Sequence, residues 1–197
     1  MRSNIVLAGV GGQGILLAAE IVGAAAVKEG YNARVSELHG MAQRGGAVVS
    51  HVRVGENALA PTVLEGTADV IVGFEPMEAL RNIKFASKRT TVLVNAKPFR
   101  ISGMQYPDIK EILEQIRGFT KNIILIDAKA LAEKVGMSIT QNIVMIGALA
   151  ATERLPVKVD ALKAALRELV PAKYLDTNIK AFELGYNAVE AHGHRFK

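Results

Sequence analysis

The chain has 197 residues, of which 50% are hydrophobic, and a formal net charge of +5. This length and composition suit one domain with a sizeable core, so we expect a single domain over 1–197. The sequence contains no Cys, which excludes disulfides, thiol catalysis, Cys-based zinc sites and iron–sulfur ligation by this chain.

The same features bound the location and the partners of the protein. No signal-type leader is readable, and no apolar run approaches the ~20 residues of a membrane span. We therefore expect a soluble, cytoplasmic protein that does not bind membranes. The basic residues are dispersed and aromatic residues make up only 5% of the chain, so binding to nucleic acid is not expected.

Short apolar runs alternate with helical patterns along the chain. In chain order we predict a strand at 4–8, a helix at 14–28, strands at 33–37, 47–54 and 69–74, a helix at 76–83, strands at 91–95 and 123–127, and helices at 128–135, 142–152, 160–169 and 178–191. A glycine- and proline-containing excursion is expected over 97–107, and the tail 192–197 is expected to fray. The alternation, with strands apolar on both faces, predicts an α/β, Rossmann-like three-layer sandwich. Its sheet should be mostly parallel, with helices on both faces and a helical C-terminus.

The clearest local signal is the turn GVGGQG at 9–14, which follows the first strand and opens the first helix. In such a G-x-G-x-x-G turn, glycines permit the tight turn, close approach to a phosphate and close helix–strand packing. The N–H groups of the helix N-terminus then favour an anion. The predicted cofactor contacts are Gly9, Gly11, Gly12, Gln13 and Gly14. The alternative is a tight turn that only packs the helix on the sheet.

A second polar segment, ELHGMAQRGG at 37–46, follows the second strand at the sheet edge where ligands bind in open α/β folds. Glu37 is placed to accept from a ribose hydroxyl of NAD, although it could face water or pair with Arg44. Arg44 is predicted to donate to an anion or to a partner carboxylate, with a solvated cation as the alternative. Further predicted partner-facing positions are His39, Met41, Gln43, Gly45, Gly46 and, in the motif SHVR at 50–53, His51. The spacing of these His residues matches no standard metal site, so no metal is predicted.

A third polar segment, GFEPMEALR at 73–81, ends another strand. Glu75 is predicted to cap the helix that begins at Pro76, and Glu78 with Arg81 is predicted to form an exposed pair. Asn95 and Asp127 end neighbouring strands and are either ligand contacts or turn residues. No Ser-His-Asp triad, Walker lysine or catalytic carboxylate pair is readable, so no catalytic residue is predicted in this chain.

These three segments, with Asn178 and AFELG at 181–185, resemble the gamma-type subunit of 2-oxoacid:ferredoxin oxidoreductases, most closely the small beta subunit of the indolepyruvate type. The resemblance spans nearly the whole chain and implies a single domain of this type. It implies an enzyme, inactive as the isolated chain, that decarboxylates a 2-oxoacid oxidatively with coenzyme A and ferredoxin, giving acyl-coenzyme A, CO2 and reduced ferredoxin.

The resemblance also implies where the cofactors lie. Thiamine diphosphate, Mg and 4Fe–4S clusters belong to a large alpha subunit, and the small subunit docks on it as a heterodimer or heterotetramer. Ferredoxin reacts through that complex, and the resemblance implies that the small subunit helps to form either the coenzyme A site, through a contact with coenzyme A, or the substrate site. Two alternatives of another class remain open at this point: a stand-alone NAD(P)-binding Rossmann dehydrogenase, and an assembly protein that reuses the fold.

Overall fold

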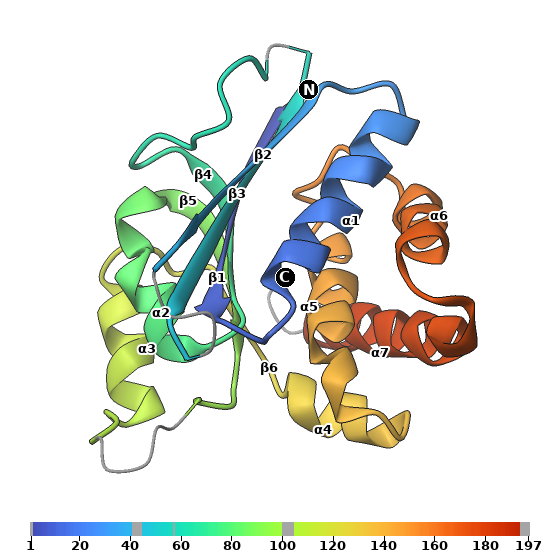
Figure 1. Cartoon of the computed structure of the whole chain (residues 1–197). Coiled ribbons are helices and arrows are strands. Elements are labelled where there is room, and N and C mark those ends of the chain that lie inside the picture. Colours follow the sequence, from blue (N-terminus) through green and yellow to red (C-terminus); the bar gives the residue numbers. More distant parts are fainter. Residues whose placement is uncertain (1, 41–44, 57, 100–104, 194–197) are drawn as a thin grey trace.

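In a computed structural model, which describes residues 2–40, 45–56, 58–99 and 105–193, the chain folds around one twisted sheet (Figure 1). Six strands of the described part of the chain pair in the order β2-β3-β1-β4-β5-β6. Their bounds are β1 Arg2–Val10, β2 Ala33–His39, β3 Ala47–Gly55, β4 Ala68–Gly73, β5 Ala86–Asn95 and β6 Ile123–Ile126. All six strand predictions are confirmed to within a few residues, except that β5 begins five residues earlier than predicted.

The sheet is mostly parallel, as predicted. Strands β1, β4, β5 and β6 pair parallel, whereas β3 runs antiparallel to both β1 and β2. The short β2–β3 connection explains the reversal, because consecutive strands joined by a short loop pair antiparallel, while parallel strands need a crossover. As a consequence β3 separates β2 from β1, so β2 is an edge strand.

Helices cover both faces of the sheet and complete the predicted three-layer sandwich (Figure 1). On one face lie α1 (Ile15–Lys28), α5 (Gln141–Ala150), α6 (Val159–Leu169) and α7 (Leu175–Gly193), with α4 (Ala128–Lys134) beside β6. On the other face lie α2 (Pro76–Arg81) and α3 (Ile109–Arg117). Short 3-10 turns at Ile83–Phe85, Ser138–Thr140 and Ala172–Tyr174 join these elements.

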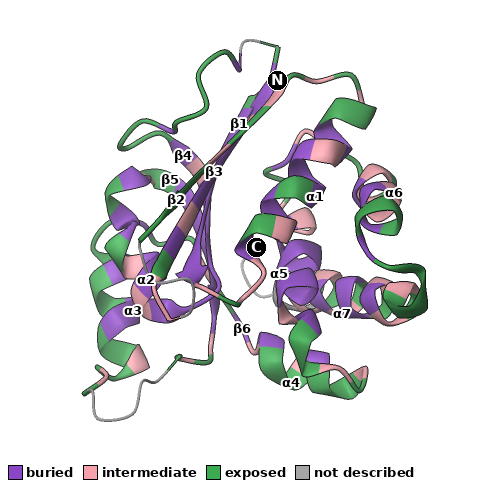
Figure 2. Ribbon diagram, in the orientation of Figure 1, coloured by how far each residue is buried: buried purple, intermediate pink, exposed green. Residues whose placement is uncertain are grey.

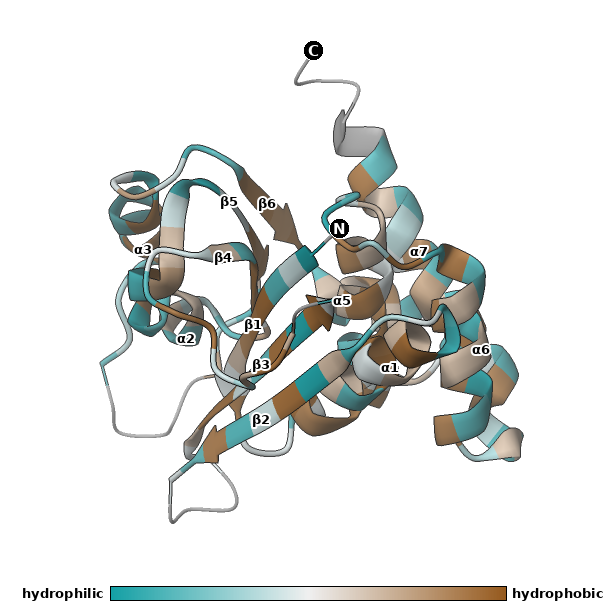
Figure 3. Ribbon diagram, turned by 90° about the horizontal axis from the view of Figure 1, so that it is seen from above, coloured by the Kyte–Doolittle hydropathy of each residue, from teal (hydrophilic) through white to brown (hydrophobic). Residues whose placement is uncertain are grey.

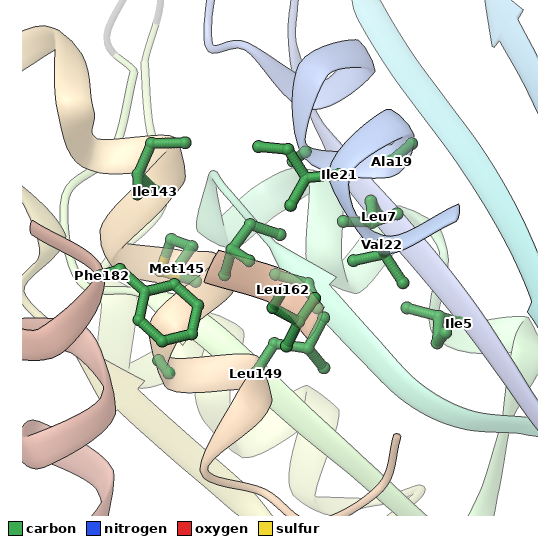
Figure 4. Packing of buried hydrophobic residues seen from close by; sticks show 14 of the residues in the cluster. Ile5, Leu7, Ala19, Ile21, Val22, Ile143, Met145, Leu149, Leu162 and Phe182 are labelled. Atoms are coloured by element: carbon green, nitrogen blue, oxygen red, sulfur yellow. The ribbon is translucent and has the colours of Figure 1, made fainter. Parts of the chain in front are cut away.

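Each face of the sheet has its own core. Leu7 of β1, Val22 of α1, Met145 of α5 and Phe182 of α7 belong to the larger one (Figure 4). Val6 and the inner side chains of α2 and α3 belong to the smaller one. Figure 2 shows the central strands buried along their length while β2 stays largely exposed. Burial on both faces is typical of parallel strands and explains why these segments read as continuous apolar runs.

The helix α3 was not predicted. Asp108 caps it by accepting a hydrogen bond from the Lys110 N–H at 2.7 Å, and Ile112 and Ile116 face the core with helical spacing. Its start lies directly after the predicted excursion, whose residues 100–104 fall outside the described part of the chain. At the other end of the chain, α7 continues through Gly193, two residues further than predicted, and 194–197 lie outside the described residues.

Helices α5 and α7 cross in close contact because glycine stands at the crossing point on each helix. A Cβ added to Gly147 would lie 1.9 Å from the carbonyl oxygen of Phe182. A Cβ added to Gly185 would lie 1.9 Å from the carbonyl oxygen of Val144. The backbones therefore touch directly, which brings the N-terminal ends of α5 and α7 to the same edge of the sheet as the glycine turn.

Candidate functional site

A cleft of about 690 Å³ lies at the carboxyl edge of the parallel strands. The glycine turn and the start of α1 form one wall, and the segments after β4 and β5 form the floor. The beginnings of α5 and α7 form the opposite wall. The residues that line the cleft include Gly12, Gln13, Gly14, Leu17, Asn95, Lys97, Lys129, Asn142, Met145, Val170 and Asn178. The predicted turn therefore does border a ligand-sized space, which both apolar and polar residues line. In Figure 3 the neighbouring strand β6 is hydrophobic along its length, whereas the edge strand β2 mixes hydrophilic and hydrophobic residues.

The glycine turn is held by contacts within the chain. The Gly11 N–H donates to the Gly46 carbonyl at 2.8 Å, which joins the turn to the start of β3. The Gln13 side chain folds back over the turn, where its Oε1 accepts from the Val10 N–H at 2.8 Å. Its Nε2 donates to the Phe74 carbonyl at 3.3 Å, so it ties the ends of β1 and β4 together.

This arrangement explains three of the four glycines of the turn. A Cβ on Gly9 would lie 2.7 Å from Gln13 Oε1, so the first glycine makes room for the folded Gln13 amide. Gly14 adopts the left-handed conformation, with φ 72°, at the N-cap of α1. Gly12, with φ 99°, has open space on its cleft side. The N–H at Gly11 and the space over Gly9 are already used, which disfavours a dinucleotide pyrophosphate at that place.

The two strand-end residues left open by the sequence are turn residues. Asn95 donates from Nδ2 to the Phe74 carbonyl at 3.2 Å and accepts at Oδ1 from the Ala128 N–H at 3.2 Å. Asp127 caps α4 through the Ala130 N–H at 3.0 Å and forms an ion pair with Lys97 at 3.1 Å. These bonds hold the cleft floor in place.

Two further amides, Asn142 of α5 and Asn178 of α7, were not predicted as site residues. Each is 6% exposed and each lines the cleft. Asn142 Nδ2 donates to the Gly14 carbonyl at 3.4 Å, and Asn178 Nδ2 donates to the Tyr174 carbonyl at 2.8 Å. Asn178 belongs to one of the motifs that carried the family resemblance, which was the available signal. Asn142 lies in a segment for which the sequence predicted only a buried apolar helix.

Lysine side chains with carboxylate partners lie at the mouth of the cleft. Lys97 and Lys129 line it, each about half exposed, and they form ion pairs with Asp127 at 3.1 Å and with Glu133 at 3.8 Å. An anionic ligand at the mouth would compete with these exposed carboxylates for the two ammonium groups. Leu17, Met145 and Val170 give the interior an apolar wall. The cleft therefore combines an apolar interior with cationic side chains at the entrance, which suits a ligand with an anionic end and a largely neutral body.

Beside the cleft, Glu75 organises a smaller pocket of about 130 Å³. It caps α2 as predicted, since its Oε2 accepts from the Glu78 N–H at 3.0 Å. Its Oε1 accepts from the Tyr106 hydroxyl and from the Phe99 N–H. Burial, and then the hydrogen bond to Glu75, raise the pKa of Tyr106, so this hydroxyl stays a donor at neutral pH.

The predicted exposed pair of Glu78 and Arg81 is half wrong. The two side chains do meet, at 2.5 Å, but Glu78 is only 4% exposed while Arg81 lies in solvent. Burial raises the pKa of Glu78, and the nearby Arg81 opposes that rise. The i,i+3 spacing correctly predicted the contact but carried no information on the burial, because the packing of the β4–α2 corner decides it.

The hairpin of β2 and β3 carries the other predicted positions. Glu37 and His39 are exposed on β2, and Gly45 borders the smaller pocket. Glu37 stands on a strand that β3 separates from β1, so it does not occupy the neighbouring-strand position that the NAD interpretation required. Met41, Gln43 and Arg44 lie outside the described residues.

His51 is not placed to meet a partner directly. Its side chain is 1% exposed, packs edge-on against the Phe85 ring at 4.9 Å, and accepts a hydrogen bond at Nδ1 from the Val63 N–H at 3.0 Å. Burial, and then the positive charge of Lys84, lower the pKa of His51. His51 lies on β3 and is covered by Val63 and Phe85. The prediction of a partner-facing side chain is therefore wrong for this residue.

Neither a metal site nor a membrane-spanning helix is found in the described part of the chain. No group of three or more His, Asp or Glu side chains in that part of the chain is arranged to hold a metal ion. None of the described helices has the length and apolar character needed to cross a bilayer.

The fold and the cleft define a Rossmann-like α/β subunit with a ligand-sized cleft at the carboxyl edge of its sheet. The family model described as pyruvate ferredoxin/flavodoxin oxidoreductase matches residues 4–188. The chain therefore belongs to that family. A relative from Archaeoglobus fulgidus, named indolepyruvate oxidoreductase subunit IorB, is 42% identical over 192 residues, which cover 95% of each chain.

Solved structures share this fold. The gamma subunit of a keto/oxoacid ferredoxin oxidoreductase from Geobacter sulfurreducens aligns with a TM-score of 0.73 at 24% identity, over 96% of this chain and 99% of that one. A 2-oxoglutarate:ferredoxin oxidoreductase from Magnetococcus marinus, solved with 2-oxoglutarate, coenzyme A and succinyl-CoA bound, aligns with a TM-score of 0.75 at 20% identity. The alignment covers 96% of this chain and 31% of that larger chain.

Proposed function

We propose that this chain is the small subunit of an indolepyruvate-type 2-oxoacid:ferredoxin oxidoreductase and that its cleft receives coenzyme A. The observation that carries the subunit assignment is the 42% identity to an indolepyruvate oxidoreductase subunit over 95% of both chains. Because the alignment spans 95% of both chains, the identity does not come from a shared nucleotide-binding segment alone. The enzyme belongs to the oxidoreductases that act on an oxo group with ferredoxin as acceptor.

The chemistry is assigned to the partner subunit. With no Cys in the sequence, this chain supplies no thiolate for a 4Fe–4S cluster. From the family membership we assign thiamine diphosphate with Mg and the clusters to a large alpha subunit, which also passes electrons to ferredoxin. In the Magnetococcus enzyme the same fold makes up 31% of a longer chain. The present chain instead joins a separate large subunit by association.

The assignment of the cleft to coenzyme A rests on its chemistry. Coenzyme A has an anionic, phosphorylated end and a long neutral arm that ends in the thiol. Lys97 and Lys129 at the mouth match the phosphates, and the apolar wall inside matches the arm. The residues of this chain would hold and orient the arm and exclude water around it, while the thiol meets the acyl group on the partner subunit.

The β2–β3 hairpin is proposed as the part that faces the large subunit. Its exposed Glu37 and His39 stand on an edge strand, and Gly46 couples the hairpin to the glycine turn through the Gly11 N–H. Arg44, which lies between β2 and β3 in the sequence, is the proposed donor to an anion or carboxylate across the interface. If Arg44→Ala leaves both subunit association and the KM for coenzyme A unchanged, this role is wrong.

The subunit assignment is tested by co-expressing the chain with a large subunit of the same organism that contains thiamine diphosphate and iron–sulfur motifs. We expect the two to co-purify and to reduce ferredoxin with indolepyruvate and coenzyme A, while neither does so alone. Co-purification without any effect of this chain on turnover would instead favour an assembly role. Tight NAD(H) or NADP(H) binding to the isolated chain, measured by calorimetry, would favour a dehydrogenase.

The cleft assignment is tested by filling the cleft in the assembled enzyme. Leu17→Trp places a large side chain in the cleft, and we expect the KM for coenzyme A to rise roughly tenfold or more, a loss of about 1.4 kcal/mol. The KM for indolepyruvate should not change. Val27→Trp, at the exposed far end of the same helix, is the matched control. An unchanged KM for coenzyme A in the Leu17 variant would remove the cleft from the proposal.

A further inference from the structure

Four side-chain amides line the cleft or its floor, and they divide into two kinds. Gln13 and Asn95 use both the oxygen and the nitrogen of their amides on backbone groups of this chain. Asn142 and Asn178 use only the nitrogen, each on one backbone carbonyl. The first pair is fully engaged in holding strand ends together, while the second pair keeps an acceptor to spare.

The orientation of the second pair is set by chemistry. Asn142 faces the Gly14 carbonyl and Asn178 faces the Tyr174 carbonyl. A carbonyl oxygen accepts and never donates, so the NH2 group of each amide has to point toward it, and the flipped alternative would place two acceptors in contact. The Oδ1 atom of each Asn is thereby turned away from its carbonyl partner.

Neither amide oxygen is engaged by the rest of the described chain. No described residue donates a hydrogen bond to either Oδ1, and neither is among the fully buried polar atoms that lack a partner. Both residues line the cleft although each is only 6% exposed overall. Two neutral acceptors are therefore presented from α5 and α7 beside the apolar side chains of Met145 and Val170.

We propose that Asn142 and Asn178 accept hydrogen bonds from the amide N–H groups of the pantetheine arm of coenzyme A. The inference rests on the proposed function and assigns the ligand's parts within the cleft. Amide oxygens bearing partial negative charge disfavour phosphate but match N–H donors, and the apolar wall around them matches an aliphatic chain. The phosphorylated end then lies at Lys97 and Lys129, where the cations are.

The test compares coenzyme A with analogues in which one pantetheine amide N–H is replaced by an ester oxygen. With the assembled wild-type enzyme we expect at least one analogue to raise the KM about 3- to 10-fold, the range of one neutral hydrogen bond. In Asn178→Ala or Asn142→Ala, the KM for coenzyme A itself should rise by a similar factor. The analogue should then cost nothing further in the matching variant.

Two additional variants separate this role from a structural one. Asn82→Ala removes an equivalent bond, from Nδ2 to the carbonyl four residues earlier at 2.9 Å, outside the cleft. It should leave the preference for coenzyme A over the analogue intact even if the variant is less stable. Asn178→Gln keeps both the donor for the Tyr174 carbonyl and the acceptor, so the analogue should still be disfavoured in that variant.

The outcomes distinguish the two proposals. If Leu17→Trp raises the KM for coenzyme A but the Asn variants retain the full discrimination against the ester analogues, coenzyme A uses the cleft and this inference is wrong. If the discrimination instead appears only with analogues that lack the adenine amino group, the acceptors contact adenine and the orientation is reversed. If Leu17→Trp has no effect, the proposed cleft function itself fails.

Discussion

Glycines allow close packing in two regions of this molecule, but the group that packs against them differs between the two. In the turn after β1, Gly9 leaves space that the Gln13 amide fills, and Gly11 donates to the β2–β3 hairpin. At the crossing of α5 and α7, Gly147 and Gly185 leave space that the backbone of the other helix fills. The first region matches a ligand-binding motif in sequence, whereas the second matches none.

A glycine pattern therefore indicates that some group approaches the backbone closely, but it does not identify that group. In the turn, the approaching group is a side chain of this chain, so the phosphate site proposed by the motif is partly filled from within. At the helix crossing, the approaching group is main chain, which has no freedom to move aside. The cost of adding a methyl group should differ accordingly.

The largest expected effect is at the helix crossing. In Gly185→Ala the new Cβ would lie 1.9 Å from the Val144 carbonyl oxygen, so the two helices have to separate. Alanine favours a helix over glycine by about 1 kcal/mol, but overpacking typically costs about 1–3 kcal/mol, and a clash with backbone that cannot move aside belongs at the upper end of that range. We expect a net fall in the free energy of unfolding, measured by urea denaturation.

The control for this variant is Gly40→Ala, where an added Cβ has open space. Its unfolding free energy should stay within about 0.5 kcal/mol of wild type. Equal stabilities of the Gly40 and Gly185 variants would contradict the direct backbone contact between α5 and α7. Gly147→Ala should repeat the result from the other helix.

A smaller effect is expected in the turn. Gly9→Ala brings Cβ to 2.7 Å from Gln13 Oε1 and 2.9 Å from Phe74 Cβ, so the Gln13 side chain is displaced. We expect a loss of about 1–3 kcal/mol. Combining the change with Gln13→Ala should cost less than the sum of the two single variants, because the displaced side chain is then absent. Strict additivity in thermal or urea unfolding would show that Gly9 does not serve to admit Gln13.

Gln13 itself should contribute less than the helix crossing. Gln13→Met keeps the volume but removes the bonds to the Val10 N–H and the Phe74 carbonyl. An unsatisfied buried group costs about 1–3 kcal/mol, part of which water in the cleft recovers. Gln115→Met, exposed on α3, is the matched control and should be nearly neutral. If the two variants unfold alike, the folded-back amide does not hold the turn.

The smallest effect should separate the two regions by pH. His51, on the hairpin strand β3, has a pKa that burial and the charge of Lys84 lower below the ordinary histidine value of about 6.5. Its stabilising contribution is therefore complete above pH 6.5 and is lost as pH falls through the lower folded-state pKa, because the unfolded chain binds the proton first. As the pH falls through that window, the protection of the Val63 amide against hydrogen exchange, relative to its intrinsic rate, should decrease in wild type but not in His51→Gln. The protection of amides at the α5–α7 crossing should not change.

Much of the fold was predictable because its signals are local. The apolar runs of β1, β4 and β5, and the Pro that opens α2, fix element type through burial and backbone preference. The prediction missed α3, where Asp108 begins a short amphipathic helix directly after a proline. It also could not anticipate that β3 inserts between β2 and β1, since strand order depends on contacts distant in sequence.

The sequence by itself determined the class of protein, the lack of cysteine chemistry, the alternating α/β pattern and the family motifs. Only the tertiary structure decided how those motifs are used. In the folded chain the Gln13 side chain folds back over the glycine turn, and His51 and Glu78 are buried. Asn142 and Asn178 line one cleft together with Gly14. The physical reason is that local preference sets the conformation of a segment, whereas burial and unused hydrogen-bonding capacity depend on neighbours that only folding supplies.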